Sequence, residues 1–368
     1  MRFQAAVLHQ PGAPLAIETV EASALRPGDV LVRMRAAGLC HTDLEVIEGA
    51  LAFPMPIVLG HEAAGIVHGV GEGVTSVGPG DHVVMSWNPH CGHCFHCDHG
   101  QPILCETYVA MGAKGLAFDG MPRLALGGRT LHHLMFIGGF AEYCIVPAQG
   151  AVKVPRDIPF DRACVLGCGV MTGVGAATRV AQVPYGASVA VIGCGAVGLN
   201  AVQGARLCGA GRIIAVDRDE RRLEAARALG ATDTAKPDDQ TIGIIRSMTS
   251  GRGADYVFEA AGHESAFKLA VEVVRPGGQV VFLGKVPVDR EVAFRWGSLM
   301  GEKKILRSSY GGARPQQDFP RLAQAYLDGA LKLDELVTSR IRLDQINEGF
   351  ARMRRGEDLR IVVEFPGG

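Results

Sequence analysis

Three spaced glycines directly after an apolar segment restrict the fold of this chain more than any other part of its sequence. Val189–Ile192 is uncharged and apolar, and Gly193-Cys194-Gly195-Ala196-Val197-Gly198 follows it at once and opens an apolar helical run through Leu207. In such a turn the first glycine permits a sharp bend, the second lets the backbone approach a pyrophosphate, and the third allows close helix packing. The sequence therefore predicts a strand, a phosphate-binding turn and a helix whose N-terminus binds the phosphates.

The chain after this turn repeats the alternation of apolar strand and helix. One helix is expected between Asp219, which can cap its start, and Gly230, which can end it. Continuous apolar runs between helices are typical of a parallel sheet covered on both faces, so we expect a doubly wound Rossmann domain. The predicted strands after the turn are Ile213–Val216, Tyr256–Phe258 and Val280–Leu283.

Asp217 ends the second predicted strand. At that position a carboxylate can accept hydrogen bonds from an adenosine ribose and would repel the 2′-phosphate of NADP. The sequence therefore favours NAD, although the neighbouring Arg218 weakens the preference.

The N-terminal part has a different pattern. Up to about Ile158 it holds short alternating segments separated by Gly and Pro turns, such as Val30–Met34 and Gly65–Val70, which predict a mostly-β domain. A length of 368 residues also favours two domains. The last predicted strand, Arg360–Phe365, could return to the first domain. The expected division of this α/β protein is a mostly-β domain, residues 1–169 and 310–368, and a Rossmann domain, residues 170–309.

Charge and cysteine usage restrict the partners and the compartment. With 37 Lys and Arg against 38 Asp and Glu, the formal net charge is -1, so no global field attracts nucleic acid or an anionic membrane. Met1 to Gly12 lacks the apolar core of a signal peptide, and we expect a cytoplasmic protein. In that compartment the ten cysteines are expected to be thiols, core residues or metal ligands.

Four cysteines are regularly spaced as C-x2-C-x2-C-x7-C in a segment of about residues 88–108. Four thiolates satisfy tetrahedral zinc and leave no position for a substrate, so this pattern predicts a structural zinc lobe. Interleaved histidines could replace a cysteine as ligands, but we interpret them as surface residues. The cysteines are Cys91, Cys94, Cys97 and Cys105, and the histidines are His90, His93, His96 and His99.

Cys40, His61 and Cys168 lie on three separate turns. Two thiolates and an imidazole would give zinc three protein ligands and leave the fourth position open for chemistry. Taken singly, a buried cysteine is usually a core residue and a histidine is usually a hydrogen-bonded polar residue. Spacing alone does not bring the three together.

Taken together, these motifs resemble the zinc-dependent alcohol dehydrogenase family of medium-chain dehydrogenases/reductases, over nearly the whole chain. The resemblance implies a GroES-like mostly-β catalytic domain, a Rossmann domain that binds NAD, and two zinc ions per subunit. It also implies a homodimer with residues 304–310 near the contact. The matching segments, in family order, are Cys40-His41-Thr42-Asp43, Gly60-His61-Glu62, the four-cysteine lobe, Gly167-Cys168-Gly169 and the glycine-rich turn.

The resemblance also implies roles for single residues. Cys40, His61 and Cys168 would hold the catalytic zinc, with Glu62 beside it and Asp43 supporting His61. Zinc would lower the pKa of a bound alcohol, and the alkoxide would pass hydride to NAD. The remaining implied contacts are Thr42 with the alcohol proton, Thr172 and Val197 with the nicotinamide, Asp217 and Arg222 with the adenosine side, and Arg360 with the pyrophosphate.

The proton relay departs from the family pattern, because Glu45 stands where many members have a histidine. We hypothesise that Glu45 or a chain of waters accepts the proton. Trp87, four residues before the lobe, matches a position that lines the family's substrate pocket, although an aromatic residue there could equally be core. It suggests a primary alcohol, aromatic or of medium chain length, or the corresponding aldehyde.

The sequence leaves three alternative functions open. The segment Lys114–Leu134 resembles a longer loop near the glutathione-linked formaldehyde dehydrogenases, but Val109 replaces the arginine of that branch and the loop after Gly49 lacks its acidic residues. A polyol dehydrogenase would favour a carboxylate over Cys168 among the ligands. A non-catalytic binding relative would have lost metal ligands, and none is missing.

Overall fold

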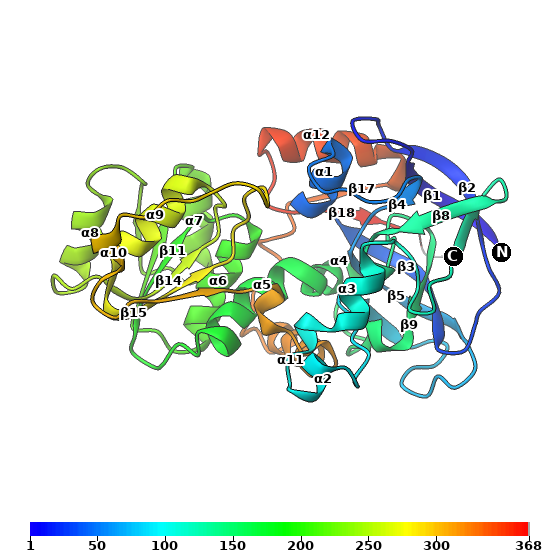
Figure 1. Ribbon diagram of the computed structural model, residues 1–368, viewed down its shortest axis with the longest axis horizontal. Coiled ribbons are helices and arrows are strands. Elements are labelled where there is room, and N and C mark those ends of the chain that lie inside the picture. The colour runs from blue at the N-terminus through cyan, green and yellow to red at the C-terminus, as the bar shows by residue number, and fades with distance from the viewer. Residues whose placement is uncertain (367–368) are drawn as a thin grey trace. The chain divides into compact units, whose positions relative to one another are not determined.

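The computed structural model describes residues 1–366 and forms two compact units (Figure 1). Unit 1 consists of Met1–Cys168 together with the chain from Arg314 onwards, and unit 2 is the continuous segment Gly169–Ala313. Each unit has its own sheets and its own buried apolar cluster.

Unit 1 is built on two sheets. Within residues 1–366, five strands close a barrel in the order β1-β2-β7-β8-β4, and seven form a sheet in the order β10-β6-β5-β3-β18-β17 with β9 also paired to β3. The barrel strands are β1 Arg2–Leu8, β2 Ala16–Ala22, β4 Ile57–Val58, β7 Leu124–Leu126 and β8 Arg129–His133. The sheet strands are β3 Asp29–Gly38, β5 Glu62–Val70, β6 His82–Met85, β9 Tyr143–Pro147, β10 Ala151–Lys153, β17 Ser339–Ile341 and β18 Ile361–Glu364. The predicted mostly-β, GroES-like architecture is confirmed.

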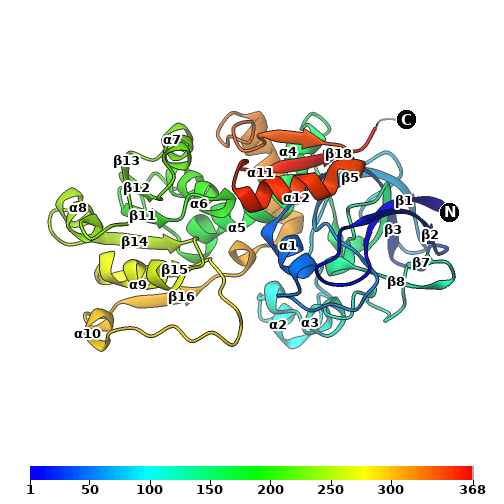
Figure 2. The ribbon, with the colours of Figure 1, turned by 90° about the horizontal axis from the view of Figure 1, so that it is seen from above.

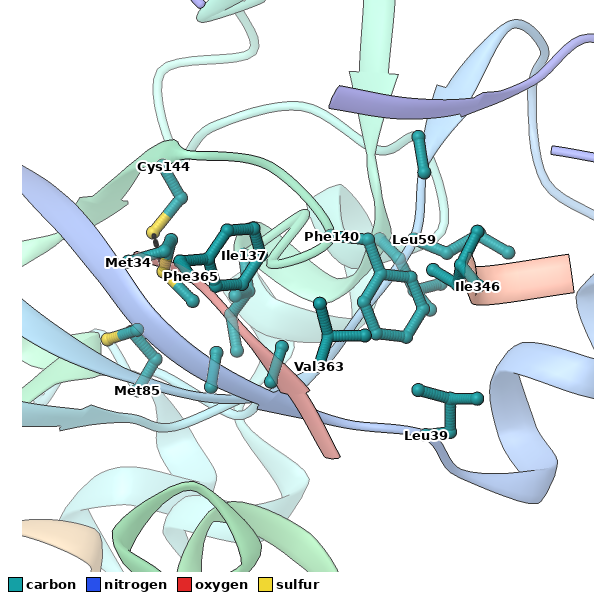
Figure 3. Close-up of a cluster of buried hydrophobic side chains, with 14 of the residues drawn as sticks. Met34, Leu39, Leu59, Met85, Ile137, Phe140, Cys144, Ile346, Val363 and Phe365 are labelled. Atoms are coloured by element: carbon teal, nitrogen blue, oxygen red, sulfur yellow. Dashed lines mark hydrogen bonds between the residues drawn. The ribbon is translucent and has the colours of Figure 1, made fainter. Parts of the chain in front are cut away.

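The C-terminal strand β18 lies inside the second sheet of unit 1. It pairs antiparallel with β3, where Val363 is opposite Ala37. Val363 and Phe365 belong to the same buried apolar cluster as Leu39 (Figure 3). The expected return of this strand to the first domain is therefore confirmed.

The helices of unit 1 surround these sheets. Both views of the ribbon show α12 beside α1 (Figures 1 and 2), where Arg354 Nε donates a hydrogen bond to Glu48 Oε1 at 2.9 Å. The helices are α1 His41–Glu48, α2 Phe95–Asp98, α3 Glu106–Gly112, α4 Phe160–Val165, α11 Pro315–Leu327 and α12 Ile346–Arg355.

Unit 2 holds a six-stranded parallel sheet in the order β13-β12-β11-β14-β15-β16. This is the doubly wound order, in which the first strand, β11, lies in the middle of the sheet. The next two strands, β12 and β13, are added on one side of it, and β14, β15 and β16 are added on the other side. The strands are β11 Ser188–Ile192, β12 Arg212–Val216, β13 Asp233–Ala235, β14 Ala254–Glu259, β15 Val274–Phe282 and β16 Lys304–Arg307. The helices are α5 Met171–Gly175, α6 Ala196–Leu207, α7 Glu220–Leu229, α8 Thr241–Met248, α9 Glu264–Val273 and α10 Trp296–Leu299.

Helix α7 shows how local chemistry sets the ends of these elements. The side chain of Asp219 accepts a hydrogen bond from the backbone N–H of Arg221 at 3.0 Å, and Gly230 adopts φ 119° after the last turn. Both predicted ends are confirmed. Strand β15 begins at Val274, earlier than predicted. The strand includes the segment Pro276-Gly277-Gly278, which interrupts the apolar pattern from which the strand was predicted.

One helical run, Phe160–Val180, is apolar and long enough to cross a membrane by length and composition. Within its apolar window, 72% is buried inside the protein, as in the core helices of globular proteins. The run contains a π-helical turn at Leu166–Val170. It is therefore explained by burial in the protein itself.

Candidate active site

Unit 1 brings Cys40, His61, Glu62 and Cys168 together, and one ligand atom of each lies within 4.8 Å of the others. Cys40 is the N-cap residue of α1, and Glu62 begins β5 directly after His61. Cys168 lies in the π-helical turn Leu166–Val170. Such turns are rare in proteins, and those that occur are often found at functional sites. We call these four residues the metal cluster.

Asp43 holds two of the turns that form the metal cluster. Its Oδ2 accepts a hydrogen bond from the backbone N–H of Cys40 at 3.2 Å, and its Oδ1 accepts one from Gly60 at 2.9 Å. The same Oδ1 lies 3.2 Å from Nδ1 of His61, and both side chains are buried. Because the ring is hydrogen-bonded through Nδ1, its other nitrogen is left for a metal.

The two thiols of the metal cluster influence each other's ionisation. A hydrogen bond from Cys168 lowers the pKa of Cys40, and the same contact raises the pKa of Cys168. Two neighbouring, half-buried thiolates therefore need a cation to be ionised together. The donor set of two sulfurs, an imidazole nitrogen and a nearby carboxylate fits zinc, which prefers these ligand types.

Glu62 and Arg360 form a buried ion pair in unit 1. Arg360 Nη2 lies 3.4 Å from Glu62 Oε1, and Arg360 Nη1 donates a hydrogen bond to the carbonyl oxygen of Leu39 at 2.6 Å. Burial raises the pKa of Glu62 to about 7, although the charge of Arg360 opposes this. Arg360 thus contacts the metal cluster within unit 1, and its contact with a pyrophosphate stays a prediction.

Thr42 and Glu45 lie on α1, half-buried and three residues apart, so they share one face of the helix. Trp87 follows β6 and packs against the apolar cluster of unit 1 while remaining partly exposed. Thr42 lies in the first turn of α1, the helix for which Cys40 is the N-cap residue. The roles predicted for these three side chains remain predictions.

The sequence motifs did not single out Tyr108, which packs against Trp87. It belongs to α3, its ring centroid is 5.9 Å from that of Trp87, and its pKa is raised by burial and by the nearby Cys168 thiol. Two further rings continue the contact, with Phe136 at 5.7 Å from Tyr108 and Phe118 at 4.8 Å from Phe136. A lone tyrosine in a short helix is ordinarily a packing residue, so no sequence signal distinguished it.

The cysteine lobe forms a second group of ligand atoms. The four sulfurs lie within 4.8 Å of one another, and the backbone N–H of Cys91 donates a hydrogen bond to Cys105 Sγ at 3.3 Å. Within residues 1–366 this group includes no histidine. His93 and His99 are exposed, as predicted, and His99 Nδ1 lies 2.7 Å from the backbone oxygen of Phe95. His90 and His96 are half-buried, so the prediction of a surface position is wrong for these two. The group of four is Cys91, Cys94, Cys97 and Cys105.

Two of the three glycines in the glycine-rich turn of unit 2, Gly193 and Gly198, leave no room for a side chain. Gly193 has φ +90°, and a Cβ there would lie 2.6 Å from the backbone nitrogen of Ala261. A Cβ on Gly198 would lie 1.8 Å from the carbonyl oxygen of Gly193. A Cβ on Gly195 would meet no atom within 4 Å, and Gly195 is the N-cap residue of α6. The turn thus leaves the start of α6 accessible to an anion.

Asp217 follows β12 and is held beside the glycine-rich turn. Its Oδ2 accepts a hydrogen bond from the backbone N–H of Cys194 at 2.7 Å, and its Oδ1 accepts one from Asp219 at 2.9 Å. Arg222 Nη1 lies 4.0 Å from Asp217 Oδ2. The other two predicted nucleotide contacts of unit 2 are Val197 on α6 and Thr172 on α5.

Comparison with known proteins gives a consistent result over the whole chain. The family described as "Alcohol dehydrogenase GroES-like domain" matches residues 26–156, and "Zinc-binding dehydrogenase" matches residues 196–328. An S-(hydroxymethyl)glutathione dehydrogenase of Escherichia coli is 37% identical over 99% of this chain and 100% of its own length. A zinc-binding domain alcohol dehydrogenase structure from Burkholderia ambifaria aligns with TM-score 0.95 at 36% identity, covering 100% of both chains. The benzyl alcohol dehydrogenase of Acinetobacter calcoaceticus aligns with TM-score 0.94 at 32% identity, also covering 100% of both chains.

Proposed function

Because this chain belongs to the zinc-type alcohol dehydrogenase family of medium-chain dehydrogenases, we propose that it interconverts a primary alcohol and its aldehyde with NAD. The observation that supports this most directly is the metal cluster, in which ligand atoms of Cys40, His61, Glu62 and Cys168 lie within 4.8 Å of one another. In the proposal Cys40, His61 and Cys168 hold a catalytic zinc, and the four-cysteine lobe holds a structural zinc.

Bound zinc would act as a Lewis acid on the oxygen of the alcohol or aldehyde, and NAD would exchange the hydride. The residues of the chain supply positioning and proton transfer. Asp43 orients the His61 ring through their 3.2 Å contact, and buried Arg360 balances the charge of Glu62. The Thr42 hydroxyl takes the proton of the alcohol and passes it towards Glu45, three residues further along α1.

The relay has its own test. Glu45→Ala should change the pH dependence of turnover, because it removes a carboxylate that can receive the proton. An unchanged pH profile would leave the water chain as the acceptor and exclude a role for Glu45.

The nucleotide site is proposed for unit 2. The open start of α6 would take the pyrophosphate, and the anchored carboxylate of Asp217 would bind the adenosine ribose and disfavour NADP. These contacts are supported by the geometry of the glycine-rich turn and by the parallel sheet order. The full proposed set is Gly193, Gly195, Val197, Gly198, Asp217, Arg222 and Thr172, together with Arg360.

Zinc content and activity together test the enzyme proposal. We expect about two zinc atoms per subunit and zinc-dependent NADH formation with a panel of aliphatic and benzylic alcohols. Cys40→Ala should lower the zinc content to one atom and abolish turnover. Cys208→Ala changes a thiol outside both metal groups and should leave both values unchanged. One zinc atom in the unaltered protein, with no alcohol oxidised, would refute the proposal.

A glutathione adduct of formaldehyde is the second candidate substrate, because the Escherichia coli relative is an S-(hydroxymethyl)glutathione dehydrogenase. A charged tripeptide needs charged partners, yet position 109 is an exposed valine, 63% accessible. We therefore expect formaldehyde oxidation with NAD to show no requirement for glutathione. A rate that depends on glutathione would reverse this choice.

We also propose a homodimer that works in the cytoplasm, where cysteine thiols and zinc ligands persist. Strand β16 is the edge of the unit 2 sheet, and Ile305 and Leu306 on it are 39% and 38% exposed. An exposed edge strand can pair with a second copy. Sedimentation should give a dimer, and Ile305→Lys should shift it towards monomer. A monomeric unaltered protein would exclude the dimer.

A further inference from the structure

A cavity of about 350 Å³ in unit 2 lies against α9 and the segment that leads into α10. Both views of the ribbon show these two helices side by side (Figures 1 and 2). The volume is at the lower end of the range found for small-molecule sites. The lining includes Lys268, Val271 and Glu272 of α9 and, further along the chain, Phe294, Arg295 and Ser298.

The cavity is separate from the proposed nucleotide site. Its lining includes none of the residues proposed to contact NAD and none of the metal cluster. Its polar end is at Glu272, in the last turn of α9, just before β15 begins at Val274 beside Ala254 at the amino end of β14. The glycine-rich turn follows the carboxyl end of β11. These are opposite edges of a parallel sheet, so a molecule bound at Glu272 leaves the nucleotide site open.

Aromatic packing fixes one wall of the cavity. The ring of Phe294 lies nearly parallel to that of Phe282 on β15, with an interplanar angle of 7° and centroids 6.2 Å apart. Phe282 in turn meets Phe267 of α9 edge-on at 4.8 Å. Phe294 is half-buried and Val271 is buried. The wall is therefore apolar and anchored to the sheet, and it suits a flat apolar group.

Glu272 is held at the polar end of the cavity by its neighbours. Arg295 Nη2 donates hydrogen bonds to Glu272 Oε1 at 3.1 Å and to Oε2 at 3.3 Å, and the Ser298 hydroxyl also donates to Oε1. Ser298 is 5% exposed, and its oxygen accepts a hydrogen bond from Arg295 Nε at 3.1 Å. The hydrogen bond from Ser298 and the charge of Arg295 lower the pKa of Glu272. This carboxylate is therefore ionised, and both its oxygens already have donors.

The unused hydrogen-bonding capacity at the cavity belongs to donors. Within residues 1–366, Arg295 Nη1 has no hydrogen-bond partner. Lys268 Nζ donates to Glu264 Oε1 at 2.7 Å, which leaves further donors of the ammonium group unused. Of the described residues that line the cavity, Glu272 is the one carboxylate. An anion that enters the cavity therefore meets two cations, whereas a cation meets no carboxylate without a partner.

We propose that this cavity binds a small aromatic carboxylate, with its ring against Phe294 and its carboxylate on Arg295 and Lys268. A guanidinium presents planar donors that match a carboxylate, and an ammonium adds a compact charge beside it. The ring gains contact with the apolar wall. An aromatic amide has the same ring but no charge for the two cations, so it binds more weakly. The inference does not depend on the proposed enzyme activity.

A fluorine NMR titration of the zinc-loaded protein with 4-(trifluoromethyl)benzoate tests the inference. Arg295→Gln should weaken binding about tenfold, the scale of one lost hydrogen bond to a charged group. Arg252→Gln, at an exposed arginine of unit 2 outside the cavity, is the matched control and should keep the affinity. The neutral 4-(trifluoromethyl)benzamide should bind about tenfold more weakly than the benzoate. An absence of benzoate binding, or equal affinity in Arg295→Gln, would overturn the inference.

Three further variants keep the test decisive. Cys40→Ala removes a ligand of the proposed catalytic zinc and should leave benzoate binding unchanged, so loss of binding there would locate the benzoate at the metal cluster and refute the inference. Arg295→Gln also removes two bonds to Glu272, so Lys268→Gln and Phe294→Leu replace it if that variant does not fold. Lys268→Gln should weaken binding about threefold and Phe294→Leu about fivefold. Unchanged affinity in both would refute the inference.

Discussion

Replacing His133 by leucine should remove a defined part of the acid sensitivity of the folded protein. His133 ends β8 of the barrel in unit 1 and is 2% exposed. Within residues 1–366 neither nitrogen of its buried ring has a hydrogen-bond partner. Burial, with the nearby Arg123 charge adding to it, lowers the pKa of His133 from 6.5 to about 4. Between about pH 6.5 and pH 4, His133 is therefore protonated in the unfolded chain but neutral in the folded protein.

The sign and size of the effect follow from these two values. Above pH 6.5 the histidine is neutral in both states and carries no pH-dependent cost, and the cost grows as the pH falls towards 4. A shift of one pKa unit corresponds to about 1.4 kcal/mol, so His133 should reduce the free energy of unfolding by about 2 kcal/mol at pH 5. The reduction levels off at about 3 kcal/mol below pH 4.

The assay is urea unfolding of the zinc-loaded protein at pH 7.5 and pH 5. The stability of His133→Leu relative to the unaltered protein should rise by about 2 kcal/mol between the two pH values. This double difference cancels packing changes and zinc release that affect both proteins alike. His68→Leu, at an exposed histidine, should show no such rise. A double difference below about 0.5 kcal/mol for His133→Leu would refute the reasoning, since it would mean that His133 is protonated in the fold.

Three further outcomes are expected. Asp43→Ala removes the carboxylate that orients His61, so zinc affinity at the metal cluster should fall about 10- to 100-fold in a competition titration; unchanged affinity would contradict this. Cys105→Ser should lower the zinc content by one atom per subunit and lower Tm, because binding energy at the lobe is also folding energy; full zinc content would count against a four-cysteine site. Asp217→Asn keeps an oxygen for the Cys194 amide but removes the charge, so the preference for NAD over NADP should fall about tenfold; a constant ratio of the two kcat/KM values would exclude this role.

Much of the fold follows from local sequence chemistry. Continuous apolar strands and the glycines of the turn at Gly193 are short-range signals, and the structure has the predicted strands, the parallel order and the ends of α7. The division near Cys168 and Ala313 depends on contacts between distant segments and was expected only approximately. The metal cluster was suggested only through family resemblance, because Cys40, His61 and Cys168 are far apart in sequence.

Other features of the site had no sequence signal. Tyr108 packs against Phe136, which lies in a turn with left-handed backbone, and the sequence motifs predict neither the contact nor the turn. Outside the site, the buried Arg123 is another example, since it donates hydrogen bonds to Asp29 at 2.7 and 3.0 Å from 94 residues away in the chain. Such contacts are decided by tertiary packing, which local pattern does not report.

The insertion of β18 into the sheet of unit 1 has a consequence for biosynthesis. Arg360 donates its hydrogen bond to Leu39 across 321 residues, so this contact forms only when the ribosome has almost finished the chain. Unit 2 is continuous and can fold while the rest is still being made, whereas the nascent N-terminal segment waits with β3 lacking one neighbour. A stop codon shortly before Ile361 would therefore damage the metal cluster, although every one of its ligands had already been translated.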